Sequence, residues 1–254
     1  MISKQNIELI RSLAHKKNRD QTGLFVAEGS KLVFDLLKTS LIPKEIFLTA
    51  DGLSACDLKL LPFNAVQLSD KDMERISAFK NPSSILALFE IPTYQEVEPP
   101  SFDGLNLVLD GLQDPGNLGT IIRLADWFGI GQIFCSENCV DNYNPKCIQS
   151  TMGAIARVRV HYLDLTKLLM EAVGQNIAIY GTYMDGENLY QTELTSHALI
   201  VMGSEGKGIS SDLNRFLTKK ISIPAYQAGN RELESLNVAV SAAIVCAEFR
   251  RRVE

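Results

Sequence analysis

The chain alternates between short apolar runs and longer segments in which apolar residues recur every three or four positions. From residue 105 onward the apolar runs predict strands at 105–112, 132–136, 157–163, 177–184, 197–203 and 220–225. Helical periodicity predicts helices at 117–130, 144–156, 165–176, 209–217 and 234–252. Strands that alternate with helices form a mostly parallel sheet with helices on both faces. We therefore predict an α/β fold for this part of the chain.

The residues before position 92 predict a second, smaller α/β domain. Strand-like runs occur at 24–29, 45–50 and 84–91, and helical periodicity occurs at 31–40 and 70–79. Residues 92–104 hold three prolines and little hydrophobic periodicity, which is typical of a linker. The predicted organisation is an N-terminal domain at 1–91, a linker at 92–104 and a larger domain at 105–254.

The first loop of chemical interest is 114–119, which follows a predicted strand. Ligands of parallel sheets bind at the carboxyl ends of the strands. Asp-Pro-Gly favours a turn, and Asn117 is the expected N-cap of the next helix. Arg123 lies off the apolar stripe of that helix, where its guanidinium group is suited to a phosphate or to ribose oxygens. An ordinary exposed arginine is the simpler interpretation of the same spacing.

The second loop, 203–208, is rich in glycine and joins a strand to a helix. It is not a Walker loop, because Val201 stands where glycine is needed and Gly208 stands where serine or threonine is needed. Glu205 would repel a phosphate. A loop of glycines and one acid therefore favours a neutral or cationic ligand.

The third region runs from Ile223 to Val238 and leads into the final helix. That helix is apolar on nearly every side, which predicts that it is buried. Asn237 in its first turn is then a buried polar group that needs partners, and Ser235 is the expected cap.

These three loops, in this order, resemble the SpoU/TrmH-type RNA 2′-O-methyltransferases of the SPOUT superfamily. Residues 117–125, NLGTIIRLA, are similar to the first motif of the family, and residues 200–206, IVMGSEG, to the second. Ile223-Pro224 followed by 234–240, ESLNVAV, is similar to the third. The likeness covers about 105–250. Residues 1–91 resemble the substrate-binding domain of the family, which is similar to an RNA-binding ribosomal protein.

The resemblance implies a C-terminal trefoil knot that binds S-adenosylmethionine and methylates a ribose 2′-hydroxyl of structured RNA, either rRNA or tRNA. It also implies a homodimer whose site draws on both subunits, and no metal. Four residues would surround the methyl donor: Thr182, Gly203, Ile223 and Leu236. Five would form the reactive site: Asn117, Arg123, Glu205, Ser235 and Asn237. The stretch 225–234 departs from the family pattern by a few extra residues and brings Arg231, Glu232 and Glu234 near the donor.

The role of Arg123 in such a site has two interpretations. A deprotonated arginine has been proposed as the base in this family, but a guanidinium pKa above about 12 makes that role costly. We favour a guanidinium group that binds the neighbouring phosphate and stabilises the developing alkoxide. Asn117 and Asn237 would orient the loop and the ribose, Glu205 would fix the loop or Arg123, and Ser235 would hydrogen-bond near the attacking oxygen.

The distribution of charge indicates how the protein could bind RNA. The net charge is −5 and the pI is about 5.4, which disfavours indiscriminate nucleic-acid binding. Residues 1–20 nevertheless hold five basic side chains against two acidic ones. Solvated surface explains such a run equally well. Together with the resemblance, the run predicts phosphate contacts for four residues: Arg11, Lys16, Lys17 and Arg19.

The remaining composition excludes several classes of protein. Five cysteines without a secretory leader predict reduced thiols, and apolar packing accounts best for Cys135 and Cys246. Cys135, Cys139 and Cys147 with His161 lack the paired C-x-x-C spacing of a zinc site. No apolar run reaches the roughly 20 residues that a membrane helix needs. We therefore expect a cytoplasmic protein that needs neither a metal nor a membrane.

Two other functions fit parts of the pattern. A non-catalytic RNA-binding or ribosome-assembly protein could keep the same fold, although it would not need all the polar motif residues. A methyltransferase of small molecules, or another nucleotide-using α/β enzyme, fits less well because of the extra N-terminal domain and the failed nucleotide loops. An RNA-binding protein without activity need not bind the methyl donor, so donor affinity distinguishes it from an RNA methyltransferase. Methyl transfer to RNA distinguishes an RNA methyltransferase from an enzyme that acts on small molecules.

Overall fold

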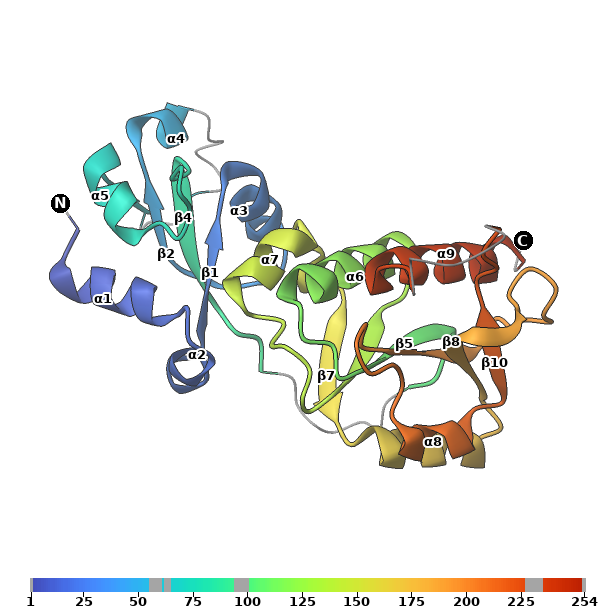
Figure 1. Ribbon diagram of the computed structural model, residues 1–254. Helices are drawn as coiled ribbons and strands as arrows, with labels where there is room; N and C mark the ends of the chain where they lie inside the picture. Colours follow the sequence, from blue (N-terminus) through green and yellow to red (C-terminus); the bar gives the residue numbers. More distant parts are fainter. Residues whose placement is uncertain (1, 55–60, 62–64, 94–100, 227–234, 253–254) are drawn as a thin grey trace. The chain divides into compact units, whose positions relative to one another are not determined.

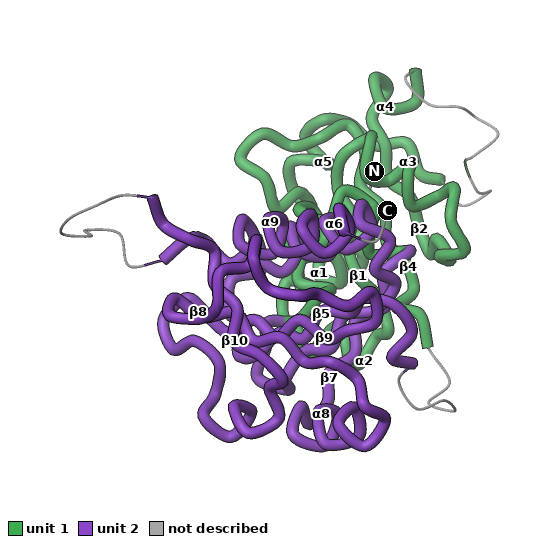
Figure 2. The backbone as a smooth tube through the Cα atoms, turned by 90° about the vertical axis from the view of Figure 1, so that its right-hand side faces the viewer, with its two compact units in different colours: residues 1–95, 141–156 green, residues 96–140, 157–254 purple. Residues whose placement is uncertain are grey.

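The computed structural model describes residues 2–54, 61, 65–93, 101–226 and 235–252 (Figure 1). The chain forms two compact units (Figure 2). Unit 1 comprises residues 1–95 and 141–156, and unit 2 comprises residues 96–140 and 157–254. Within the described residues, no helix is both long enough and apolar enough to span a membrane.

Unit 2 is built on a six-stranded sheet with the order β10-β8-β9-β5-β6-β7, and every pairing in it is parallel. Its strands are β5 (Leu105–Asp110), β6 (Gln132–Ser136), β7 (Arg159–Leu163), β8 (Ala178–Asn188), β9 (Ala198–Gly203) and β10 (Lys219–Ser222). The central β5 is buried along its whole length, as strands covered on both faces are. The predicted α/β fold with a mostly parallel sheet is confirmed.

Helices cover both faces of this sheet. They are α6 (Pro115–Trp127), α8 (Leu165–Gly174), the 3₁₀ helix η3 (Ser211–Phe216) and α9 (Val238–Arg251). Figure 1 shows α6 and α9 side by side on one face and α8 on the other. Leu168 and Leu169 of α8 pack in one core cluster with Val108 of β5 and Phe134 of β6.

Three local expectations in unit 2 need correction. Helix α6 begins at Pro115 with Asp114 as its N-cap, so Asn117 lies in the first turn and is not the cap. Proline suits the first helical position because its φ is already helical and it has no N–H group to satisfy. The segment expected to be helical at 209–217 forms the 3₁₀ helix η3, and α9 begins at Val238.

Unit 1 contains a four-stranded sheet with the order β1-β4-β2-β3. Its strands are β1 (Leu24–Glu28), β2 (Pro43–Leu48), β3 (Ala65–Gln67) and β4 (Ile85–Glu90). Its helices are α1 (Lys4–Ser12), α2 (Lys16–Thr22), α3 (Ser30–Leu37), α4 (Ala50–Ser54), α5 (Asp70–Ile76), α7 (Pro145–Thr151) and the 3₁₀ helix η2 (Ala154–Ala156). β4 is antiparallel to both β1 and β2. The strands and helices predicted before residue 92 are all present.

The grouping of residues 141–156 with unit 1 differs from the expected boundary, which placed them in the C-terminal domain. Helix α7 packs against β1, and the ring of Tyr143 lies 5.0 Å from that of Phe25. Cys147 and Ile148 of α7 are buried. The core of unit 1 is therefore completed by a segment from beyond residue 140.

Candidate active site

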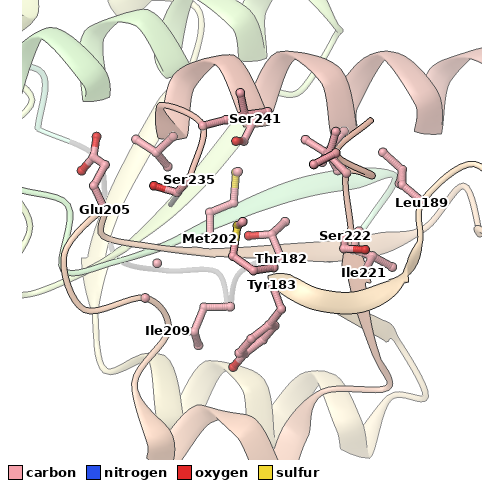
Figure 3. Close-up of a pocket in the computed structure, with 18 of the residues that line it drawn as sticks. Thr182, Tyr183, Leu189, Met202, Glu205, Ile209, Ile221, Ser222, Ser235 and Ser241 are labelled. Atoms are coloured by element: carbon pink, nitrogen blue, oxygen red, sulfur yellow. The ribbon is translucent and has the colours of Figure 1, made fainter. Parts of the chain in front are cut away.

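A cavity of about 630 Å³ lies at the carboxyl ends of β8, β9 and β10 and against α9 (Figure 3). All four residues expected around a donor line it: Thr182, Gly203, Ile223 and Leu236. Glu205 and Ser235, expected in the reactive site, also line it. The volume lies within the range of about 300–1,000 Å³ that is usual for small-ligand sites.

Gly203, the last residue of β9, lets the next loop turn back over the end of the strand. A Cβ atom at this position would lie 2.0 Å from the carbonyl carbon of Gly208 and 2.3 Å from the nitrogen of Ile209. The nitrogen of Gly208 donates to the carbonyl of Ser204 at 2.9 Å, and Gly208 has φ +66°. This tight turn places Glu205 at the edge of the cavity.

A chain of polar side chains links three loops beside the cavity. The amide nitrogen of Asn237 donates to Oδ1 of Asn117 at 3.1 Å, and the amide nitrogen of Asn117 donates to Oε1 of Glu205. The structure thus brings together residues from the first turn of α6, the loop after β9 and the start of α9. The carboxylate is the acceptor at the end of this chain.

The environment of Asn237 corrects two expectations. The residue is exposed and not buried, and it is itself the N-cap of α9. Its Oδ1 accepts from the backbone nitrogens of Ala239 at 3.0 Å and Val240 at 3.3 Å. Ser235 therefore does not cap the helix. The side chain of Val240 is 51% exposed, so α9 is not buried on every side.

Arg123 does not join the polar chain. It is exposed on α6, does not line the cavity, and makes no hydrogen bond or ion pair with any residue that the structure describes. Its guanidinium group is available to an anion from outside the chain.

Two residues that the sequence analysis missed help to shape the cavity. Asp110, buried at the end of β5, accepts from the backbone nitrogen of Ser210 at 2.7 Å and so holds the far end of the loop after β9. Tyr183 of β8 lines the cavity, and Nζ of Lys220 lies 4.4 Å from its ring centroid. Burial, followed by the negative charges of Asp185 and Asp110, raises the pKa of Tyr183.

The basic residues near the N-terminus differ in their surroundings. Lys17 is exposed, Lys16 pairs with Asp20 at 2.9 Å, and Nε of Arg11 donates to the carbonyl of Arg75 at 2.8 Å. These three side chains remain candidates for phosphate contact, because their charged groups lie at the surface.

The expectation of phosphate contact is wrong for Arg19. It is only 1% exposed, and its Nε donates to Oδ2 of Asp141 at 3.0 Å. Its Nη1 donates to the carbonyl of Leu13 at 2.7 Å. A guanidinium group that is buried and fully engaged in this way is not available to a phosphate.

The thiols of Cys135 and Cys246 are buried, as expected from apolar packing. Among the residues that the structure describes, no three His, Cys, Asp or Glu side chains converge in a way that could hold a metal ion. Cys56 lies outside the described residues, as do Arg231, Glu232 and Glu234 of the extended stretch.

A parallel sheet with helices on both faces and a ligand-sized cavity at the carboxyl ends of its strands, with the Glu205 carboxylate in its lining, is typical of α/β proteins that bind a small ligand. The chain belongs to the SpoU rRNA methylase family, whose model matches residues 104–247. Residues 4–87 match the MRM3-like substrate binding domain. The resemblance seen in the three loops is thereby confirmed.

Relatives cover almost the whole chain. The 23S rRNA (guanosine(2553)-2′-O)-methyltransferase RlmP of Bacillus subtilis is 31% identical over 97% of this chain and 96% of its own length. A TrmH-family protein from Porphyromonas gingivalis is 39% identical, with a TM-score of 0.87 and 99% of both chains covered. An AdoMet-bound rRNA methyltransferase from Sinorhizobium meliloti is 27% identical, with a TM-score of 0.84, 100% of this chain and 98% of that chain covered.

Proposed function

We propose that this protein transfers a methyl group from S-adenosylmethionine to a ribose 2′-hydroxyl of structured RNA, either rRNA or tRNA. The observation that carries this proposal is the cavity at the ends of β8, β9 and β10, whose lining residue Glu205 is hydrogen-bonded to Asn117 and through it to Asn237. The family match and the RNA 2′-O-methyltransferase activity in the name of the Bacillus subtilis relative support it.

The cavity suits S-adenosylmethionine in size and charge. Its lining is mainly apolar, from residues such as Met202, Ile221 and Val245, and Glu205 supplies negative charge at the edge. An apolar pocket with a few placed polar groups is typical of small-ligand sites, and a carboxylate favours a cationic sulfonium ligand. When bound, S-adenosylmethionine supplies an electrophilic methyl group. Thr182, Gly203, Ile223 and Leu236 would hold it.

The residues of the polar chain act on the RNA side of the reaction. Because a 2′-hydroxyl is a poor nucleophile at neutral pH, its proton must pass to solvent water as the new O–CH3 bond forms and the S–CH3 bond of the donor breaks. Asn117 and Asn237 orient the ribose, Glu205 accepts from the amide of Asn117 and so fixes it, and Ser235 hydrogen-bonds near the attacking oxygen. Arg123 remains cationic, binds the adjacent phosphate and stabilises the developing alkoxide. Correct orientation of donor and acceptor supplies much of the rate enhancement.

We also propose that this chain forms the trefoil knot that the family resemblance implies. We place it between residues 200 and 240, where β9, η3, β10 and the start of α9 follow one another. The strand order, with β8 between β10 and β9, and the contribution of β8, β9, β10 and α9 to one cavity support this placement.

A homodimer completes the proposed site. Arg123 lies outside the cavity of its own chain, and α6 and α9 expose large apolar side chains. These are Trp127 at 84% and Val240 at 51% exposure, and Leu236, just before α9, is 49% exposed. Such side chains are typical of the core of a protein interface. A second copy seated on α6 and α9 would cover them and bring its own Arg123 to the cavity.

A mixing experiment tests the shared site. Arg123→Ala and Gly203→Ala each impair one part of a composite site, so the separately purified variants are expected to transfer the methyl group much more slowly than wild type. After unfolding and co-refolding, mixed dimers contain one site with both parts intact, and we expect a substantial fraction of wild-type transfer to return. Recovery of no activity would show that each site is built from a single chain.

Transfer of tritium from labelled S-adenosylmethionine to total RNA, followed by mapping of ribose methylation, tests the proposal as a whole. We expect labelled 2′-O-methyl nucleotides with the wild-type protein. Arg123→Ala should lose at least about 100-fold in rate, the magnitude usual for loss of one charge-stabilising donor, with unchanged donor binding by calorimetry. RNA binding without measurable affinity for S-adenosylmethionine would favour a non-catalytic RNA-binding protein, and transfer to small molecules alone would favour the other alternative.

The exposed basic side chains near the N-terminus, among them Lys16 and Lys17, bind phosphates of the RNA in this proposal. Reversal of charge in Lys16→Glu with Lys17→Glu is expected to weaken RNA binding and to reduce the slope of log affinity against log salt concentration by about 0.7–0.9 per lost phosphate contact. Fluorescence anisotropy at several salt concentrations measures both quantities. Unchanged affinity and slope would remove α2 from the RNA interface.

A further inference from the structure

The C-terminal end of α9 is bonded to the turn that follows β8. Nη2 of Arg252 donates to the carbonyls of Leu189 at 3.2 Å and Tyr190 at 2.6 Å, and Nη1 donates to the carbonyl of Thr192. Nε of the same side chain donates to Oε1 of Glu248 at 2.7 Å. One guanidinium group therefore holds three backbone carbonyls and one carboxylate.

Glu248 fixes the direction of this guanidinium group. It is only 6% exposed, and it also accepts from Arg251 at 2.8 and 2.7 Å. The hydrogen bonds from Arg251 and then from Arg252 lower the pKa of Glu248 to about 2, so the carboxylate is ionised at neutral pH. Arg251 makes no bond to the turn in the described part of the chain, and its side chain is 67% exposed. The two arginines share one partner, but only Arg252 reaches the turn.

The turn held by Arg252 forms one end of the cavity. Leu189 is fully buried and lines the cavity, and its backbone nitrogen donates to the carbonyl of Ser222, another lining residue, at 2.9 Å. Figure 3 shows Leu189 near Ser222, at the opposite end of the cavity from Glu205. Without Arg252, three carbonyl groups that point toward one position would lose their shared donor, and the turn would lose the cation that orders it.

We propose that Arg252 is a positioning residue for binding of the methyl donor. It fixes the turn 189–192 so that Leu189 closes the end of the cavity remote from the reactive polar chain. This inference rests on the proposed function, in which that cavity binds S-adenosylmethionine. Because the turn lies away from Asn117, Glu205 and Asn237, Arg252 affects donor affinity and not the chemical step.

Arg252→Met and Arg251→Met form a matched pair that tests the inference. Both keep an unbranched stem and remove a guanidinium group from Glu248, but only Arg252→Met frees the carbonyls of the turn. We expect Arg252→Met to raise the Kd of S-adenosylmethionine about tenfold, as loss of a charge-assisted hydrogen bond does. The kcat at saturating donor and the KM for RNA should stay within about twofold of wild type. Arg251→Met should leave the Kd unchanged.

Arg252→Lys covers the case in which Arg252→Met does not fold. A single ammonium group keeps the charge but not the fork that spans several carbonyls, so its Kd should fall between those of wild type and the methionine variant. A folded Arg252 variant that binds the donor like wild type, or an equal weakening in Arg251→Met, would overturn the inference. A wild-type protein that does not bind S-adenosylmethionine would instead contradict the proposed function.

Discussion

The side-chain oxygen of Asn237 accepts from two backbone nitrogens at the start of α9, while its amide nitrogen donates to Asn117. Asn237→Asp keeps the capping acceptor but removes the donor. We expect this variant to lose at least about tenfold in transfer rate, since one hydrogen bond is worth about that much. Its free energy of unfolding should remain within about 0.5 kcal/mol of wild type. Asn237→Ala loses both roles and should also be destabilised by about 1 kcal/mol.

Initial rates at saturating donor and urea unfolding measure the two effects separately. Asp164, which caps α8 through bonds to the nitrogens of Thr166 and Lys167, provides the control. Asp164→Ala should be destabilised by about 1 kcal/mol without a change in transfer rate. Wild-type activity in Asn237→Asp would leave Asn237 with a capping role alone.

The hydrogen bonds of Glu248 predict how the free energy of unfolding changes at acid pH. Its pKa of about 2 lies below the ordinary value of 4.5, because it accepts hydrogen bonds from Arg251 and Arg252. The ionised carboxylate therefore stabilises the fold above about pH 4.5, and this contribution is lost as the pH falls toward 2. We expect Glu248→Gln to lower the free energy of unfolding at pH 7 and to weaken its pH dependence between these limits. Chemical denaturation at several pH values tests this, and parallel pH profiles for the two proteins would contradict it.

At the residue scale, the three motifs that resemble the family supplied the predicted site residues, but not the partners of each side chain. Glu205 and Gly203 were found because glycines and one acid follow a strand within a few positions. Asp110 was missed because a single acid at the end of an apolar strand carries no distinctive pattern. The burial and ion pairing of Arg19 could not be predicted, because its partner Asp141 lies 122 positions away in the sequence.

At the scale of elements, the close approach between Gly203 and Gly208 predicts that the loop after β9 cannot keep its position if Gly203 gains a side chain. Gly203→Ala would place a methyl group about 2 Å from the backbone of Gly208, which the loop can relieve only by moving away. We expect donor affinity and transfer rate both to fall at least about tenfold, because a misplaced loop removes both Glu205 and a wall of the cavity. Calorimetry and initial rates measure these losses.

Gly206→Ala is the matched control in the same loop. A Cβ atom at Gly206 would meet nothing within 4 Å, and its φ is not positive. We expect this variant to bind the donor and transfer the methyl group as wild type does. Equal effects from the two substitutions would mean that the sensitivity lies in the mobility of the loop and not in the approach of Gly203 to Gly208.

Most elements followed from hydrophobic periodicity, and the exceptions have physical causes. All six strands of unit 2 were predicted, because buried parallel strands are short continuous apolar runs. The segment at 209–217 has helical spacing but forms a 3₁₀ helix of only six residues. The apolar surface of α9 predicted burial, whereas Val240 is half-exposed. Periodicity reports which face of a helix is apolar, not whether the same chain or a second copy covers it.

At the scale of the whole molecule, the chain passes between the two units three times, after residues 95, 140 and 156. A division of the sequence at the proline-rich segment predicts only the first of these crossings. The return of 141–156 to unit 1 depends on contacts that local patterns do not contain, such as the rings of Phe25 and Tyr143. The fold class could be predicted, but the composite nature of unit 1 could not.

The buried pair of Arg19 and Asp141 tests whether unit 1 depends on that returning segment. Asp141→Asn leaves a guanidinium group that is 1% exposed without its counter-charge, which costs about 3–5 kcal/mol at buried pairs. Asp126→Asn breaks a more exposed pair with Arg157 and should cost no more than about 1 kcal/mol. Hydrogen exchange resolves the effect by element. Exchange in β1 and α7 should accelerate together in Asp141→Asn while β5 stays protected, because the segment 141–156 shares a core with β1. Acceleration in α7 alone would show that unit 1 folds without it.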